Sequence, residues 1–178
     1  MSSLIDRQIS SWARQGGLQP FDPELVNPAS INLRVGPTAK IETPNGIEDL
    51  DLSRYSDTFP YWVPPQGWIL TDVMERIRID PDMEALVVLR SSAARRGWDH
   101  ALAGYVDPGY GYNTPDGSVL TLEFVNCLRY HHLPIYPGLQ LVQLRISMLQ
   151  TVPTQHYGHT GRYNGAQRVE GCKDLSLQ

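Results

Sequence analysis

The stretch Val119-Leu-Thr-Leu-Glu-Phe-Val-Asn126 carries the clearest strand pattern in this sequence. Successive side chains of a strand point to opposite faces, so Leu120, Leu122 and Phe124 would share one apolar face. The odd-numbered residues, including Glu123, would share the other face. The stretch therefore predicts a strand that packs against a core on one side and carries a carboxylate on the other.

Pro and Gly divide the rest of the chain into segments of similar character, which predicts a mainly β fold. The predicted strands are residues 31–35, 69–79, 85–89 and 139–146. Residues 3–15 form the exception, because their apolar residues recur at helical spacing after a Ser3-x-x-Asp6 capping box. We expect one short N-terminal helix that ends at Gly16-Gly17, and a single domain over 1–178.

Composition excludes several classes of protein. The chain has 178 residues, 41% of them hydrophobic and 19% charged, which is enough apolar content for a core. A net charge of −4 gives no basic field for a nucleic-acid backbone. We find no apolar run long enough for a membrane span or signal peptide, and the only cysteines, Cys127 and Cys172, predict no disulfide framework. We therefore expect a cytoplasmic protein that binds neither membrane nor nucleic acid.

Glu123 admits two interpretations from the pattern alone. It could be an exposed or salt-bridged acid on the polar face of an edge strand. Alternatively, it could lie in a partly dry pocket, where desolvation raises a carboxyl pKa toward the range of a general acid and base.

Residues 89–97, Leu-Arg-Ser-Ser-Ala-Ala-Arg-Arg-Gly, place hydroxyls and guanidinium groups directly after an apolar strand. Such a junction could hold a polyphosphate, or it could simply begin a helix whose arginines face solvent. It is not a Walker loop. No zinc-deaminase signature is present either, so we expect no metal site in the protein and no zinc.

These segments, taken in order, resemble the dCTP deaminase family of the dUTPase-like superfamily. The resemblance rests on residues 89–97, on Ala103-Gly-Tyr-Val-Asp-Pro-Gly-Tyr110, and on residues 120–126. Residues 27–36, Leu133-Pro-Ile-Tyr-Pro-Gly138 and the tail around Tyr157 extend it over nearly the whole chain. It implies a distorted β-barrel or jelly roll, a homotrimer with shared active sites, and hydrolysis of dCTP to dUTP and ammonia without zinc.

The resemblance also implies roles for individual residues. Glu123 would be the general base, Ser91 and the carbonyl of Ala103 would orient the attacking water, and Arg95 would maintain the local charge. Mg²⁺ would arrive with the triphosphate, and residues 155–178 would form a flexible lid. The implied substrate-binding residues are Arg90, Ser92, Asp107, Thr121, Leu122, Gln143, Tyr157, Arg162, Tyr163 and Gln167.

The sequence departs from the family pattern in three places. Arg162 stands where a Lys is usual, Gln167 is shifted by one position, and the connection before Glu123 is longer, which we assign to a hairpin extension at 113–118. The alternatives are a bifunctional enzyme that also removes pyrophosphate, a dUTPase, a deaminase of dCMP or a modified cytosine nucleotide, and a silent nucleotide-binding trimer. Asn126 favours a deaminase without the second activity.

Overall fold

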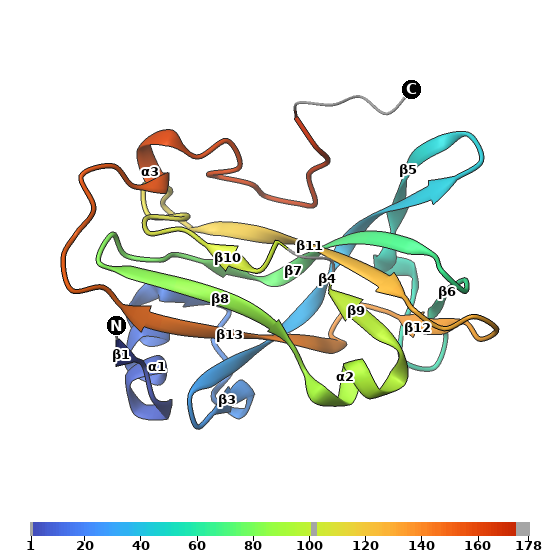
Figure 1. Ribbon diagram of the computed structural model, residues 1–178, viewed down its shortest axis with the longest axis horizontal. Helices are drawn as coiled ribbons and strands as arrows, with labels where there is room; N and C mark the ends of the chain where they lie inside the picture. Colours follow the sequence, from blue (N-terminus) through green and yellow to red (C-terminus); the bar gives the residue numbers. More distant parts are fainter. Residues whose placement is uncertain (1, 101–102, 174–178) are drawn as a thin grey trace.

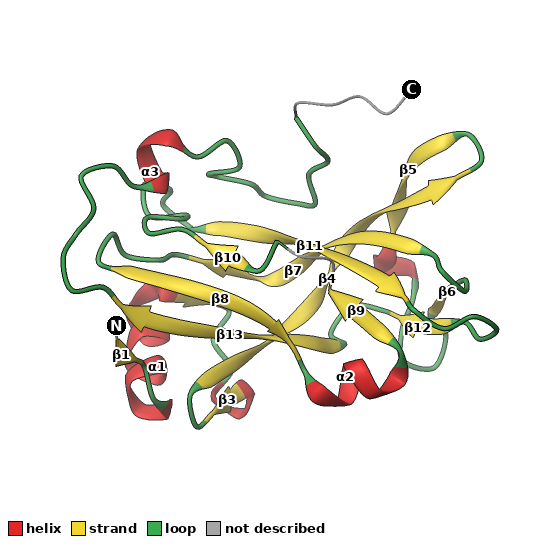
Figure 2. Ribbon diagram, in the orientation of Figure 1, coloured by secondary structure: helices red, strands yellow, loops and turns green. Residues whose placement is uncertain are grey.

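One long strand, β4 (Ser30–Thr43), connects the two halves of a curled sheet in the computed structural model, which describes residues 2–100 and 103–173 (Figures 1 and 2). The other strands are β1 (Ser2–Ser3), β2 (Leu18–Gln19), β3 (Val26–Asn27), β5 (Gly46–Asp51), β6 (Tyr61–Val63), β7 (Trp68–Ile77), β8 (Met83–Leu89), β9 (Trp98–His100), β10 (Tyr105–Val106), β11 (Ser118–Asn126), β12 (Leu133–Ile135) and β13 (Gln140–Met148). The α-helices are α1 (Asp6–Trp12), α2 (Ser91–Arg96) and α3 (Tyr157–Thr160).

The main sheet follows the order β10-β8-β13-β4-β7-β11-β9, and β12 pairs with β6 in a separate small sheet. The first half of β4 pairs with β13, with Ile31 opposite Leu144. Its second half pairs with β7, with Ala39 opposite Thr71, and with β5. The register shifts between these halves, which lets the sheet curl into a half-barrel. The mainly β fold is confirmed, with a curled sheet of the kind that the resemblance implied.

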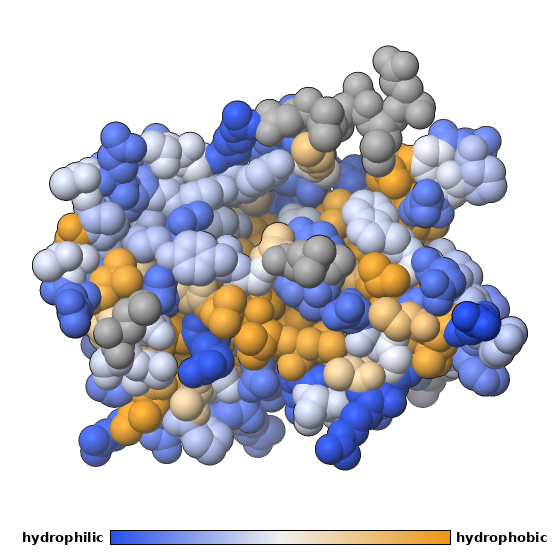
Figure 3. All heavy atoms as spheres, in the orientation of Figure 1, coloured by the Kyte–Doolittle hydropathy of each residue, from blue (hydrophilic) through white to orange (hydrophobic). Residues whose placement is uncertain are grey.

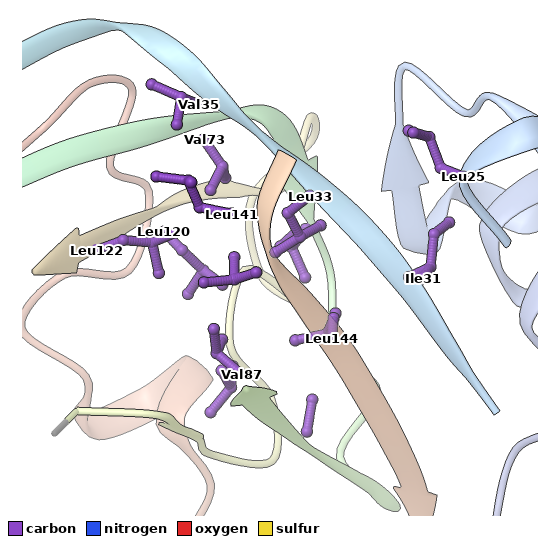
Figure 4. Close-up of a cluster of buried hydrophobic side chains, with 14 of the residues drawn as sticks. Leu25, Ile31, Leu33, Val35, Val73, Val87, Leu120, Leu122, Leu141 and Leu144 are labelled. Atoms are coloured by element: carbon purple, nitrogen blue, oxygen red, sulfur yellow. The ribbon is translucent and has the colours of Figure 1, made fainter. Parts of the chain in front are cut away.

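The core lies inside the curl, where β4, β7, β8, β11 and β13 contribute apolar side chains (Figure 4). Leu122 and Phe124 are 2% and 0% exposed, and Leu120 is also buried. Thr121 and Glu123 on the opposite face are only partly buried. The predicted alternation along residues 119–126 is therefore confirmed.

The N-terminal helix begins later than predicted. Ser3 belongs to β1, which pairs with β13 at the edge of the sheet, so it does not cap the helix. Instead, the side-chain oxygen of Gln8 accepts a hydrogen bond from the Ile5 backbone N–H at 3.1 Å. The helix continues past Trp12 as a wider turn over Ala13–Gly17 and ends there as predicted. Gly16, at φ +95°, supplies the left-handed conformation that ends it.

The connection before β11 is a loop of successive turns and not a hairpin extension. Backbone hydrogen bonds join Tyr112 N to Gly109 O, Thr114 N to Gly111 O, and Gly117 N to Thr114 O. The flanking strands explain the difference, because β10 pairs with β8 whereas β11 pairs with β7 and β9. Residues 107–117 therefore form this loop of turns.

Across residues 2–100 and 103–173, no helix is long and apolar enough to cross a membrane.

Candidate functional site

A cleft of about 1070 Å³ lies on the outer face of β11, β7, β4 and β5, beneath the C-terminal tail. It contains five of the predicted site residues, which are Ala103, Thr121, Glu123, Tyr157 and Tyr163. We call it the carboxylate cleft. Both lysines of the chain, Lys40 and Lys173, also line it, although no sequence motif singles out either lysine beyond the alternation of β4.

Glu123 lies on a strand that is not at the edge of the sheet. Its strand β11 has β7 on one side and β9 on the other, so the edge-strand interpretation does not apply. Its side chain is 24% exposed, and its buried Oε2 has no hydrogen-bond partner among the described residues. Burial raises the pKa of this carboxyl. The side chain therefore holds a proton at higher pH than an exposed glutamate does, which makes its carboxylate the stronger base.

His100 lies beside this carboxylate and was not identified from the sequence. It is opposite Phe124 in the β9–β11 pairing, and the two rings meet edge to face with their centroids 5.6 Å apart. Its Nε2 is 3.8 Å from Glu123 Oε2, which is too long for a hydrogen bond. Burial lowers the pKa of His100 while it raises that of Glu123, so the site favours the neutral form of both groups. Only the pairing of the three-residue strand β9 reveals this neighbour.

The tail runs along β11 and bonds to its backbone and side chains. The Gly165 N–H donates to the Ser118 hydroxyl at 2.6 Å, and the Val119 N–H donates to the Ala166 carbonyl at 3.0 Å. Ala166 is buried against the sheet. The first part of the tail is therefore held against β11 of the same chain.

Two threonine hydroxyls hold the next part of the tail. Thr38 accepts from the Val169 N–H at 3.0 Å and donates to the buried carboxylate of Asp72 at 2.6 Å. Thr121 accepts from the Glu170 N–H at 3.1 Å. The hydroxyl of this predicted substrate-binding residue thus faces the tail.

Aromatic side chains close one end of the carboxylate cleft. The rings of Tyr110 and Tyr157 lie 5.3 Å apart, and the Tyr157 hydroxyl accepts from the Tyr163 N–H at 3.1 Å. The Tyr157 N–H donates to Pro108 O at 2.7 Å, next to the predicted substrate-binding residue Asp107. Asp107 is exposed, and partial burial of its carboxyl raises its pKa. Asp107 and the tail thus lie close together at this end of the cleft.

The predicted phosphate residues lie at α2, on the side of the molecule away from α3 and the tail (Figure 1). Arg90 is the N-cap of α2, and Ser91, Ser92 and Arg95 are exposed on the helix. Arg90 and Ser92 line a second cleft of about 510 Å³, whose lining includes no acidic side chain. We call it the guanidinium cleft. Within one protomer, then, the predicted site residues line two separate clefts.

The remaining predicted contacts are scattered. The Gln143 side-chain oxygen on β13 accepts from the Ser30 hydroxyl at 2.6 Å. Leu122 points into the core, so only its backbone could contact a base. Gln167 is exposed, and its side-chain amide donates to the Gly165 carbonyl at 3.0 Å. Arg162 is exposed, and its carbonyl accepts from Lys173 Nζ at 2.7 Å.

No group of three or more His, Cys, Asp or Glu side chains in the described part of the chain is arranged to hold a metal ion. The prediction that zinc takes no part stays a prediction.

Comparison with known proteins identifies the family. The family model for dCTP deaminase-like proteins matches residues 3–149. The "dCTP deaminase, dUMP-forming" of Salinispora arenicola is 29% identical over 180 residues, which cover 91% of this chain and 89% of that protein. The protein of the same name from Mycobacterium avium is 30% identical over 181 residues, with 91% and 90% covered.

Solved structures share the fold. The 2'-deoxycytidine 5'-triphosphate deaminase from Agrobacterium tumefaciens superposes with a TM-score of 0.65 at 20% identity, over 83% of this chain and 49% of that one. The dUTPase from Streptococcus mutans gives a TM-score of 0.52 at 13% identity, over 77% of this chain and 98% of its own. With a family model that spans most of its length, this chain belongs to the dCTP deaminase-like family.

Proposed function

We propose that this protein is an enzyme that deaminates dCTP by hydrolysis, with Glu123 as the general base. The observation that carries the proposal is a carboxylate in a cleft, partly buried, with one oxygen that accepts no hydrogen bond from the described residues. The names of its relatives, dCTP deaminase, support the reaction.

In the proposed mechanism, Glu123 takes a proton from the attacking water and passes it toward the ring nitrogen N3 and the leaving amine. Its raised pKa suits both steps, because a base that has accepted the proton must also give it up. Ser91 and the Ala103 carbonyl orient the water, and Arg95 maintains the charge around it. Ala103 lies in the carboxylate cleft, whereas Ser91 and Arg95 lie on α2.

We propose that a complete site needs two protomers of a homotrimer, with the guanidinium cleft of one facing the carboxylate cleft of the next. The separation of the two clefts within one chain supports this arrangement. Apolar side chains also gather on the face over β8 and β13 (Figure 3). There Leu86 is 42% exposed, and Tyr105 on the edge strand β10 is 55% exposed. A partner subunit would cover both.

We further propose dUMP as the final product, so that deamination is followed by loss of pyrophosphate. The names of the relatives support this alternative over a dUTP-releasing enzyme. Asn126 is not an argument against this second activity, because the residue is fully buried and has a structural role. Its amide donates to the carbonyls of Val63, Pro64 and His131 at 3.1, 3.0 and 2.9 Å.

Mg²⁺ would accompany the triphosphate. The guanidinium cleft offers guanidinium, hydroxyl and amide groups without a carboxylate, so phosphate oxygens and water would supply the ligands of the ion. We also propose that the tail acts as a lid over the carboxylate cleft, and that the enzyme works in the cytoplasm. The exposed free thiols of Cys127 and Cys172 suit a reducing compartment. Residues 174–178 of the predicted lid lie outside the described part of the chain.

The test is to incubate the purified protein with Mg²⁺ and either dCTP, dCMP, CTP or dUTP, and to resolve ammonia, pyrophosphate and nucleotide products separately. We expect ammonia, pyrophosphate and dUMP from dCTP. Ammonia with dUTP alone would retain the deaminase and reject the second step. No ammonia from any cytosine nucleotide would reject the proposed function.

A further inference from the structure

Arg90 stands at the entrance of the guanidinium cleft with its backbone held on both sides. Its N–H donates to the Leu141 carbonyl at 2.9 Å, and its own carbonyl accepts from Ala93 and Ala94 in the first turn of α2. Its Cα position is therefore set by β13 and by the helix. These backbone hydrogen bonds do not determine the direction of its long side chain, which depends on other contacts.

Gln140, the first residue of β13, supplies that cause. One guanidinium nitrogen, Nη1, donates to the Gln140 carbonyl at 3.2 Å and to the Gln140 side-chain oxygen at 3.1 Å. Because the guanidinium is planar and rigid, two bonds to one nitrogen set the plane of the whole group. The other nitrogens are then left to face the cleft, which both residues line.

Two asparagines determine which end of the Gln140 amide faces Arg90. Asn32 Nδ2 donates to the same Gln140 oxygen at 3.0 Å, and Asn27 Nδ2 donates to Asn32 Oδ1 at 2.9 Å. Asn32 is 6% exposed, so these bonds are shielded from water. Asn32 and Gln140 both accept at their side-chain oxygens, and the row ends with the Gln140 oxygen on the guanidinium.

We propose that Gln140, oriented by Asn32, is a positioning residue that aims the Arg90 guanidinium at the triphosphate of the substrate. The neutral amide matters, because a carboxylate in its place would neutralise the cation that has to bind phosphate. The inference rests on the proposed function only in naming the ligand as a nucleoside triphosphate. Its physical content is an oriented arginine in a cleft that contains no acid.

The test compares Gln140→Met, Gln140→Glu, Arg90→Met and the double variant Arg90→Met/Gln140→Met. The probes are inorganic tripolyphosphate, by titration calorimetry, and dCTP, by steady-state kinetics. Met keeps the length of Gln without its acceptor oxygen. We expect Gln140→Met to weaken tripolyphosphate binding and to raise the KM for dCTP by about tenfold, the usual worth of a hydrogen bond to a charged group. The kcat should change by less than about twofold, since Arg90 takes no part in proton transfer.

Gln140→Glu guards against misfolding of the Met variant, because it keeps an oxygen for both donors. We expect it to raise the KM at least as much as Met does, through charge and not through loss of the contact. In the Arg90→Met background, Gln140→Met should add less than about a twofold change. Gln150→Leu, on the exposed segment after β13, is the control for an amide substitution and should match the wild type.

A merely structural role would lower the thermal midpoint and change the kcat regardless of Arg90. The inference is therefore overturned if Gln140→Met leaves tripolyphosphate binding and the KM unchanged, if its effect persists in full without Arg90, or if the wild type does not bind tripolyphosphate. The expected binding pattern without deamination of any cytosine nucleotide would reject the proposed function and retain the inference. If the protein deaminates dCTP but Gln140→Met changes neither tripolyphosphate binding nor the KM, the proposed function is retained and the inference is rejected.

Discussion

Replacing Glu123 by Gln should abolish turnover and stabilise the fold at the same time. The amide keeps the shape of a side chain that is 24% exposed, but it cannot accept the proton of the attacking water. General acid–base catalysis contributes a factor of about 10² to 10⁴, so kcat should fall by that factor. This corresponds to about 3 to 5.5 kcal/mol of transition-state stabilisation. Trimer formation and nucleotide binding should persist.

The gain in stability follows from the direction of the pKa shift. Burial raises the pKa of Glu123, so the folded protein holds this proton more tightly than the unfolded chain does. Ionisation therefore costs stability, a cost that grows as the pH rises through the ordinary glutamate range and is complete above the raised pKa. A neutral amide removes it. With a buried oxygen that lacks a partner, we expect a gain of roughly 1 kcal/mol, or about 2 to 4 °C in thermal midpoint.

The assay combines deamination rates with thermal unfolding across a pH series. The wild-type rate should rise with pH through the raised pKa of Glu123, because only the carboxylate can act as base. The stability advantage of Glu123→Gln should appear at neutral pH and vanish in acid, where the wild-type carboxyl is protonated. Glu42→Gln, at an exposed position on β4, is the matched control and should change neither quantity. A variant that keeps more than half of the wild-type turnover would refute the assignment of Glu123 as base.

Two further predictions concern metal and tail. A zinc-selective chelator should leave the deamination rate unchanged, whereas EDTA in excess of Mg²⁺ should weaken triphosphate binding. If selective removal of zinc abolished activity and zinc alone restored it, the mechanism would be wrong. Truncation after Gln155 should leave a folded trimer with much lower dCTP affinity and turnover, because it removes the tail that covers the carboxylate cleft, and nucleotide should protect the full-length tail from proteolysis. If the truncated protein had the wild-type rate and KM, the tail would take no part in substrate binding or turnover.

The sequence predicted most of the central strands because their side chains alternate strictly. Residues 119–126 show why: every apolar residue on one face meets the core, which leaves Glu123 on the other. The errors came where local signals compete with pairing partners. Ser3 looks like a helix cap, yet its backbone completes an edge pair with Ser147. The Pro-Asp-Gly turn looks like a hairpin, yet its flanking strands pair elsewhere.

The sequence proposes candidate residues for the site but does not indicate how they are arranged. Nothing in the spacing of Ser91 and Glu123 indicates that they belong to different clefts of one protomer. The sequence could not predict His100 as a neighbour of Glu123, because a three-residue strand has no periodicity of its own. Its place beside Glu123 follows only from the register with Phe124. The amide row behind Arg90 joins residues more than a hundred positions apart, since Asn32 and Gln140 are separated by 108.

The division of β4 between two halves of the sheet also has a consequence for how the protein is made. Its second half can pair with β5 and β7 soon after it is synthesised, but the first half needs β13. Ser30 and its partner Gln143 are 113 residues apart. At roughly 5 to 20 residues per second, the buried faces of Ile31 and Leu33 remain without that strand for about 6 to 23 seconds. During that interval the edge of β4 that later pairs with β13 stays open, although β3 already pairs with the other edge. This is the stage at which the nascent chain would most need a chaperone.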